Sequence, residues 1–231
     1  MTTTIQLTDN TRQRTKTLAA GGLTLSGVVL ISVFLAAGGE AGYQSVLFVW
    51  THVFAVIAAG LVAAAGTAIL YADGSHRLGL AGLLGTGFAW LATGAAALWV
   101  PIAWQATVFT QTGSSSLDTY LALFSPFGSA YFVVFSLLVG ASVAGLGIGF
   151  RRTNLVHRPV AGFATLVGAV SVVWMLYALA TAMANPLEGT AVTIPLFVVL
   201  WLSVVSLGGS LFVKNRSDYG ETSSRDATSA D

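Results

Sequence analysis

The sequence predicts an all-α integral membrane protein, built as a bundle of six transmembrane helices with both termini in the cytoplasm. Hydrophobic residues make up 55% of the 231 residues and charged residues only 8%, whereas a soluble domain has about 25% charged residues. Apolar stretches long enough to cross a membrane recur along the chain. The basic residues between these stretches all fall on one side of the predicted membrane.

Six apolar stretches can each cross a hydrocarbon core of about 30 Å at a helical rise of about 1.5 Å per residue. The clearest is residues 45–71, which contains no charged residue. The expected spans are residues 18–39, 45–71, 78–100, 128–150, 160–184 and 190–213. Residues 1–17 form a cytoplasmic N-terminal tail. Residues 214–231 are polar and are expected to form a disordered cytoplasmic tail.

Two segments allow two interpretations each. Residues 18–39 are longer than the apolar core of a signal peptide, which favours a retained first span. The sequence Ala36-Ala37-Gly38 resembles a cleavage site, however, and cleavage would leave five spans. Residues 117–124 carry apolar side chains at i, i+3, i+4 and i+7. They form either a helix in the membrane interface or the outer end of the fourth span, bent at Pro126.

The distribution of charge predicts the orientation. With six spans, all ten Lys and Arg residues lie on one side, in the two tails and in the turns after the second and fourth spans. The opposite side carries Glu40, Asp118 and Glu188 and no Lys or Arg. The positive-inside rule then places both termini in the cytoplasm. The net charge of +1 gives no reason to expect a nucleic-acid partner. The lipid bilayer is the expected partner, and a membrane-protein partner or a homo-oligomer stays open.

Small residues recur every four positions along three of the expected spans. They include Ala55, Ala59 and Ala63 in the second span, Gly85 and Ala89 in the third, and Gly140 and Ala144 in the fourth. Such a face lets helix backbones approach closely, in lipid where no hydrophobic effect drives helices together. A wall of a solute path is an alternative, but packing alone explains the spacing. We therefore expect the second and third spans to pack on each other through these faces.

The tryptophans fall into two groups. Trp50, Trp99 and Trp104 lie near the outer surface, where amphipathic rings are favoured. Trp90, Trp174 and Trp201 lie deeper in their spans and are expected to pack between helices.

His52 is the single histidine within an expected span. An ionisable residue there is a candidate functional site by default. Because it lies beside the small-residue face, we expect it to point into the bundle and to meet hydroxyls such as Thr93 and Thr181. It could ligate haem, relay a proton or bind a quinone carbonyl. The preferred interpretation is a neutral imidazole that is hydrogen-bonded to a neighbouring helix.

Neither haem nor quinone is favoured as a cofactor. The other two histidines, His76 and His157, lie in cytoplasmic turns on the opposite side of the membrane from His52. A haem would therefore need a methionine, such as Met175 or Met183, as its second axial ligand. No other feature of the sequence supports that pairing.

Several enzyme classes are excluded by missing residues. The chain has no cysteine and therefore no thiol chemistry or disulfide. Both lysines lie outside the spans, which excludes a retinal Schiff base. No zinc-protease, serine-hydrolase or P-loop motif occurs, and no metal site or catalytic residue is predicted.

The leading hypothesis is a non-enzymatic protein of the cell membrane, either a small-solute permease or a membrane subunit of a larger complex. One alternative is a redox-associated anchor that binds haem or quinone near His52. Another is a structural or regulatory partner of a second membrane protein.

Overall fold

The computed structural model describes residues 9–36, 46–98, 100, 116–182 and 190–228, and within them the side chains of 13–32, 50–51, 53–72, 78–98, 100, 133–180 and 195–217. This part of the chain is all-helical. Its elements are α1 (Asp9–Ala36), α3 (Val46–Ala97), α5 (Ser116–Thr153), α6 (Arg158–Ala182) and α7 (Thr190–Thr228).

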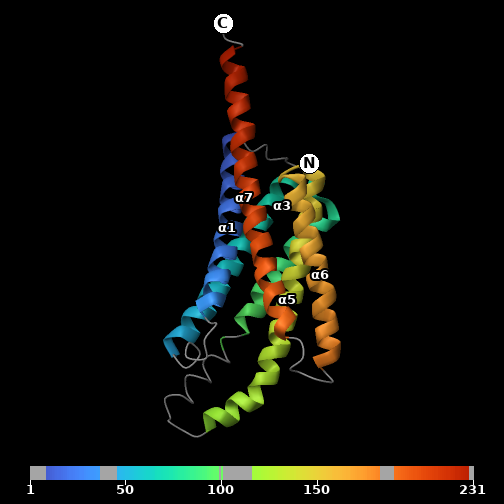
Figure 1. Ribbon diagram of the computed structural model, residues 1–231. Coiled ribbons are helices and arrows are strands. Elements are labelled where there is room, and N and C mark those ends of the chain that lie inside the picture. The colour runs from blue at the N-terminus through green and yellow to red at the C-terminus, as the bar shows by residue number, and fades with distance from the viewer. Residues whose placement is uncertain (1–8, 37–45, 99, 101–115, 183–189, 229–231) are drawn as a thin grey trace, which may run out of the picture.

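Helix α3 contains the second and third spans and folds back on itself. A Cβ atom added at Gly60 would lie 2.9 Å from Oγ1 of Thr93, although a straight helix would separate these residues by roughly 50 Å. Figure 1 shows α3 running along the bundle and returning. The sequence predicts a polar turn at residues 73–77, and the helical pattern instead continues through the reversal. Gly79 has a φ of 63° there, which glycine adopts without steric cost.

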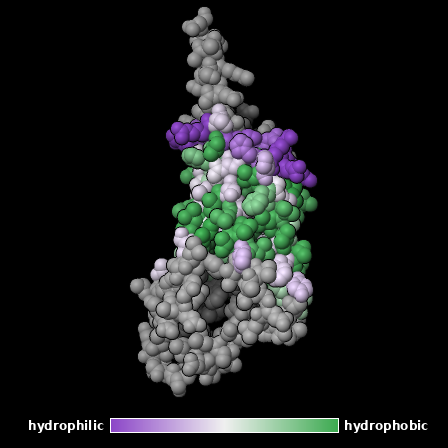
Figure 2. Space-filling model, in the orientation of Figure 1, coloured by the Kyte–Doolittle hydropathy of each residue, from purple (hydrophilic) through white to green (hydrophobic). Residues whose placement is uncertain are grey.

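Six segments in the described part of the chain are long and apolar enough to span a membrane. They are Gln13–Ser32, Val53–Ala72, Leu78–Ala97, Val133–Thr153, Arg158–Ala180 and Pro195–Ser217. Large apolar side chains such as Phe54, Leu91 and Val173 point outward and are 58–68% exposed. Figure 2 shows the hydrophobic belt that such side chains form around the bundle. These features indicate a multi-pass membrane protein.

The helices form a closed ring around a central core. α1 packs against α7 and α3, α3 against α5, α5 against α6, and α6 against α7. The first half of α3 meets α1, because Gly66 lies against Ala19. The second half meets α5, because Gly85 lies against Gly145. The α5–α6 contact is the most extensive.

One end of the bundle is polar and positively charged. The side-chain amide of Asn215 in α7 donates hydrogen bonds to Thr17 Oγ1 at 3.2 Å and to the Gln13 carbonyl at 3.4 Å in α1. The backbone N–H of His157, just before α6, donates to Ser210 Oγ of α7 at 2.9 Å. Figure 1 accordingly shows the start of α1 and the end of α7 at the same end of the molecule.

We call this end the basic end, because the described Lys and Arg side chains gather there. They are Arg14, Lys16, Arg151, Arg152, Arg158, Lys214 and Arg216. Figure 2 shows the corresponding hydrophilic band above the hydrophobic belt. The turn between α5 and α6 is built as a helix C-cap, with Asn154 at a φ of 53°. The Leu155 N–H donates to the Phe150 carbonyl at 3.2 Å, the long bond of a Schellman motif.

Two further findings concern the ends of helices. Composition predicts disorder from residue 214, and α7 instead stays helical to Thr228. A helix that the sixth span has already nucleated needs only propagation, which costs far less than a new nucleus.

Residues 117–124 belong to α5 and continue into the fourth span rather than forming a separate helix. The N-terminal part of α5 lies at an angle to the remainder (Figure 1).

Candidate functional site

Glycine lets the second half of α3 touch α5 backbone to backbone. A Cβ added at Gly85 would lie 2.6 Å from the Leu146 nitrogen, and one at Gly145 would lie 2.8 Å from Gly85 Cα. Real Cβ atoms do not approach so closely, so these positions require glycine in the present packing. Ser142 Oγ adds a hydrogen bond of 2.8 Å to the Gly85 carbonyl. Gly85 therefore packs on the fourth span, whereas the sequence suggests the second span as its partner.

Glycines also allow close backbone contact between α5 and α6. A Cβ at Gly140 would lie 3.0 Å from Ser171 Cβ, and one at Gly168 would lie 2.5 Å from the Ala144 nitrogen. Helix α1 joins its neighbours similarly, since a Cβ at Gly27 would lie 3.1 Å from the Trp201 carbonyl oxygen of α7. The ring is therefore held by close backbone contacts, as expected in lipid.

The centre of this ring is not completely filled. A partly open cavity of about 50 Å³ lies between α1, both halves of α3, α5 and α7. Its lining consists of Leu23, Ser26, Leu30, Val56, Ala59, Gly60, Ala63, Thr67, Ala89, Ala92, Thr93, Ala96, Phe135, Val139, Ser142, Val143, Leu146, Trp201, Val204 and Leu207. On each helix these residues reach from the middle of the span toward the end opposite the basic end.

The cavity surface is almost wholly apolar even though four hydroxyl residues line it. Three of these hydroxyls donate to carbonyls of their own helix, Ser26 to Leu23 at 2.9 Å, Thr67 to Ala64 at 3.0 Å and Thr93 to Ala89 at 2.9 Å. The fourth, Ser142, donates to Gly85 as described above. Their donor hydrogens are therefore used within the protein, and the cavity presents mainly carbon.

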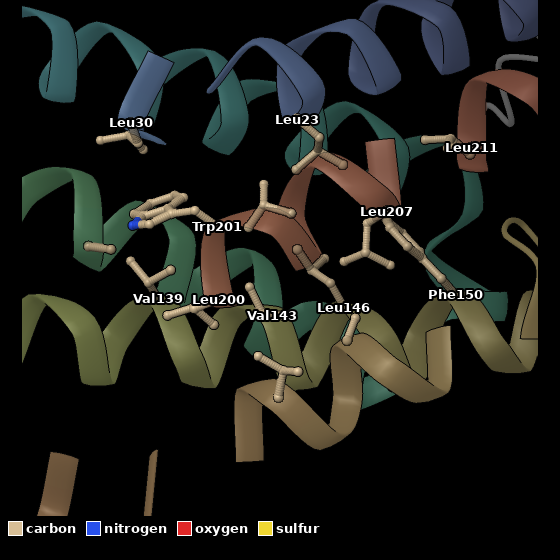
Figure 3. Packing of buried hydrophobic residues seen from close by; sticks show 14 of the residues in the cluster. Leu23, Leu30, Val139, Val143, Leu146, Phe150, Leu200, Trp201, Leu207 and Leu211 are labelled. Atoms are coloured by element: carbon tan, nitrogen blue, oxygen red, sulfur yellow. The ribbon is translucent and has the colours of Figure 1, made fainter. Parts of the chain in front are cut away.

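Trp201 also lines the cavity mainly through carbon atoms, but its donor is unpaired. Its Nε1 is buried without a hydrogen-bond partner among the described residues, and its side chain is only 5% exposed. Leaving a buried donor unpaired costs about 1–3 kcal/mol. The indole is held by Phe197 in a T-shaped contact at 5.5 Å and by Phe135, stacked at 6.3 Å. Figure 3 shows the ring between Leu30 and Val139, with its nitrogen pointing away from Leu207 and Leu211.

Large buried side chains close the cavity toward the basic end. Leu78, Phe150, Val156, Leu207 and Leu211 are at most 1% exposed. In Figure 3 Leu207, Phe150 and Leu211 lie beyond Trp201 on that side. This layer separates the cavity from the basic end.

The structure places several of the predicted residues around the cavity. Ala59, Ala63, Ala89 and Thr93 line it, and Ala55 is half-buried. Thr93 also makes the contact with Gly60 that joins the two halves of α3. Gly140 and Ala144 lie in the α5–α6 interface instead.

The side chains of His52 and Thr181 lie outside the described residues, so their predicted meeting with Thr93 stays a prediction. Val56 and Gly60 continue the row of His52 at four-residue spacing, and both line the cavity.

The tryptophans differ from one another. Trp201 packs between helices as expected, whereas Trp90 is 46% exposed. Trp201 is not among the site residues that the sequence predicts. The available signal was an indole N–H placed well inside an apolar span, far from the interface where tryptophan is usually favoured.

The cavity does not fit the redox cofactors considered for this chain. A dry cavity that holds benzene measures about 150 Å³, so neither a quinone ring nor a haem fits in about 50 Å³. Among the described residues, no group of three or more His, Cys, Asp or Glu could hold a metal ion.

The chain matches no protein-family model, no curated protein and no solved structure.

Proposed function

We propose that this protein is a non-enzymatic permease of the cell membrane for a small, uncharged solute, with both termini in the cytoplasm. The observation that carries the proposal is the central cavity, which five of the six spans line.

The cavity favours a solute site over a purely structural role. Unfilled space in a packed core lowers the free energy of unfolding in proportion to its volume. An unpaired indole N–H lowers it further. In a bundle with a purely structural role, a larger side chain at position 59 or 92 would fill the space and increase the stability. The small residues at both positions keep it open.

The lining selects for uncharged solutes. Moving an ion from water into a carbon-lined space costs far more than moving a neutral molecule. A cavity needs about 10–15 Å³ of probe-occupied volume to hold one water molecule, so about 50 Å³ is space for roughly three to four groups of that size. A neutral solute of about three heavy atoms suits this space.

The positions of the charges and of the buried layer support an orientation. If the basic end faces the cytoplasm, as the positive-inside rule requires, the cavity lies in the outer half of the membrane. The layer of Phe150, Leu207 and Leu211 then seals the inner side. This is the arrangement of a permease closed on its cytoplasmic side, and transport requires that layer to part.

Uptake into proteoliposomes tests the proposal. Formamide is an uncharged solute of the required size, and formate is its charged counterpart of the same number of heavy atoms. We expect formamide to enter faster than into protein-free vesicles at neutral pH, and formate to show no protein-dependent uptake. Equal formamide rates with and without protein would contradict the proposal.

A further inference from the structure

We propose that the outward side of the α1–α7 pair, at the basic end, binds an anionic phospholipid of the surrounding membrane. The phosphate lies between Arg14 of α1 and Arg216 of α7, and an acyl chain runs along the two helices below them. This inference goes beyond the proposed function and does not depend on it.

The two arginines lie on the same side of the helix pair. Helices α1 and α7 are antiparallel (Figure 1), and Asn215 of α7 is hydrogen-bonded to Gln13 and Thr17 of α1. Each next residue of a right-handed helix is turned by about 100°. In an antiparallel pair, the residues that follow two facing residues are therefore turned toward the same side. Arg14 and Arg216 are these following residues, and both are exposed.

Apolar side chains lie on the same side, one helical turn deeper in the membrane. Leu18 follows Arg14 by four residues, and Phe212 precedes Arg216 by four, so each shares a helix face with its arginine. Leu18 is 67% exposed and Phe212 is 45% exposed. The surface therefore combines a cationic upper part with an apolar lower part, as a phospholipid does with opposite charge.

Two glycines leave open space further along this side. A Cβ added at Gly208 of α7 would lie 2.7 Å from the Thr24 nitrogen and 2.8 Å from the Ala20 carbonyl oxygen of α1, so these residues face each other. The residues that follow Gly208 and Ala20 are Gly209 and Gly21, and a Cβ added at either meets nothing within 4 Å. We call this side of the pair the outer seam. It consists of Arg14, Leu18, Gly21, Gly209, Phe212 and Arg216.

The arginines of the outer seam lie at the depth of lipid phosphates. Arg14 is the second residue of its candidate span, and Arg216 is the second from the end of its own. The hydrophilic band directly borders the hydrophobic belt in Figure 2. The described side chains include no Asp or Glu, so no carboxylate among them neutralises these two cations. A phosphate supplies the missing charge and matches the guanidinium geometry.

A lipid suits the outer seam better than an acidic polypeptide. Leu18 and Phe212 lie inside candidate spans, at a depth that a soluble polypeptide reaches only by leaving water. An acyl chain occupies this depth already, and the open space at Gly21 and Gly209 can take it without displacing a side chain. One ligand with a phosphate and a hydrocarbon chain therefore fits both parts of the seam.

Fluorescence quenching by brominated lipids tests the inference at the seam itself. The chain has no cysteine, so Gly209→Cys provides a single attachment point for a bimane label. The matched control is Gly87→Cys on α3, which is also in open space. Gly209 lies eight residues from Ser217 and Gly87 nine from Leu78, the residues at the basic ends of their spans. The full-length protein is reconstituted into mixed phosphatidylglycerol and phosphatidylcholine vesicles in which one of the two lipids is brominated.

We expect brominated phosphatidylglycerol to be preferred over brominated phosphatidylcholine at position 209 by at least about fivefold, since each nearby Lys or Arg favours an anionic lipid by about that factor. At position 87 the two lipids should quench equally. Arg216→Gln should lower the preference at position 209 by about fivefold. Arg151→Gln removes an exposed arginine at the same depth on α5 and should leave the preference unchanged.

Several results would overturn the inference. These are equal quenching by both lipids at position 209, the same preference at position 87, and equal losses for Arg216→Gln and Arg151→Gln. Displacement of phosphatidylglycerol from position 209 by soluble polyglutamate would assign the seam to an acidic polypeptide instead. If Arg216→Gln does not fold, the comparison of positions 209 and 87 decides. Failure of formamide uptake would contradict the permease and leave this inference standing.

Discussion

Ser142 in α5 donates a hydrogen bond of 2.8 Å to the carbonyl oxygen of Gly85 in α3, 57 residues away in the chain. A serine hydroxyl reaches a backbone carbonyl of another helix only when the two backbones lie very close. Gly85 and Gly145 provide that closeness because neither carries a side chain. The α3–α5 contact therefore combines close packing with a polar bond, two forces that hold helices together in lipid.

We expect Gly85→Leu to destabilise the bundle, because its Cβ would lie 2.6 Å from the Leu146 nitrogen. Overpacking typically costs about 1–3 kcal/mol of unfolding free energy, and a clash with backbone lies at the upper end. The matched control is Gly87→Leu on the same helix, where a Cβ meets nothing within 4 Å. Thermal unfolding in detergent measures both. Equal midpoints for the two variants would refute the α3–α5 interface.

Ser142→Ala should cost less, about 0.6 kcal/mol and at most about 2, as is typical for hydrogen bonds between membrane helices. The control is Ser206→Ala, which removes an exposed hydroxyl bonded within its own helix at 2.8 Å. Denaturation in mixed micelles would compare the two. A larger loss for Ser206→Ala would count against the interhelical bond.

The sequence predicts this contact only in part. Spacing of four residues identifies Gly85 and Gly140 as members of packing faces, because the helical repeat alone determines which residues share a face. It does not identify the partner, since any small face can pack on any other. The structure pairs Gly85 with α5, and the two halves of α3 meet through Gly60 and Thr93 instead.

The cavity is still harder to predict. Five segments line it, and their relative positions are set by packing between helices. The cavity therefore cannot be predicted from the sequence pattern of any single segment. The Trp201 N–H is unpaired because no acceptor among the described residues lies within hydrogen-bonding distance of it, and this too depends on the packing of neighbouring helices. The helical continuation of α7 to Thr228 likewise arises from the preceding span rather than from local composition.

We predict that His52 faces the interior of the bundle, because Val56 and Gly60 in its row line the cavity. His52→Ala should then lower stability by about 1–3 kcal/mol, since a partner hydroxyl or carbonyl loses its bond. His52→Gln retains a donor and an acceptor and should restore part of the loss. Nitroxide accessibility at position 52 provides the check, and a value equal to that of a lipid-facing control would reject the prediction.

The orientation predicts opposite locations for two reporter fusions. A reporter fused after residue 231 should be cytoplasmic, because all ten Lys and Arg residues lie on that side. A reporter inserted at Gly113, between the third and fourth spans, should be extracytoplasmic. Detection of both reporters in the same compartment would contradict the arrangement of six spans.

The most direct measurement of the central claim is formamide uptake by Ala92→Leu compared with Gly94→Leu. Ala92 lines the cavity, so a leucine there should fill it. Gly94 lies two residues further along α3, where an added Cβ meets open space. We predict that Ala92→Leu folds but loses protein-dependent uptake, and that Gly94→Leu transports like the wild type. Undiminished uptake by a folded Ala92→Leu variant would show that the solute does not pass through this cavity.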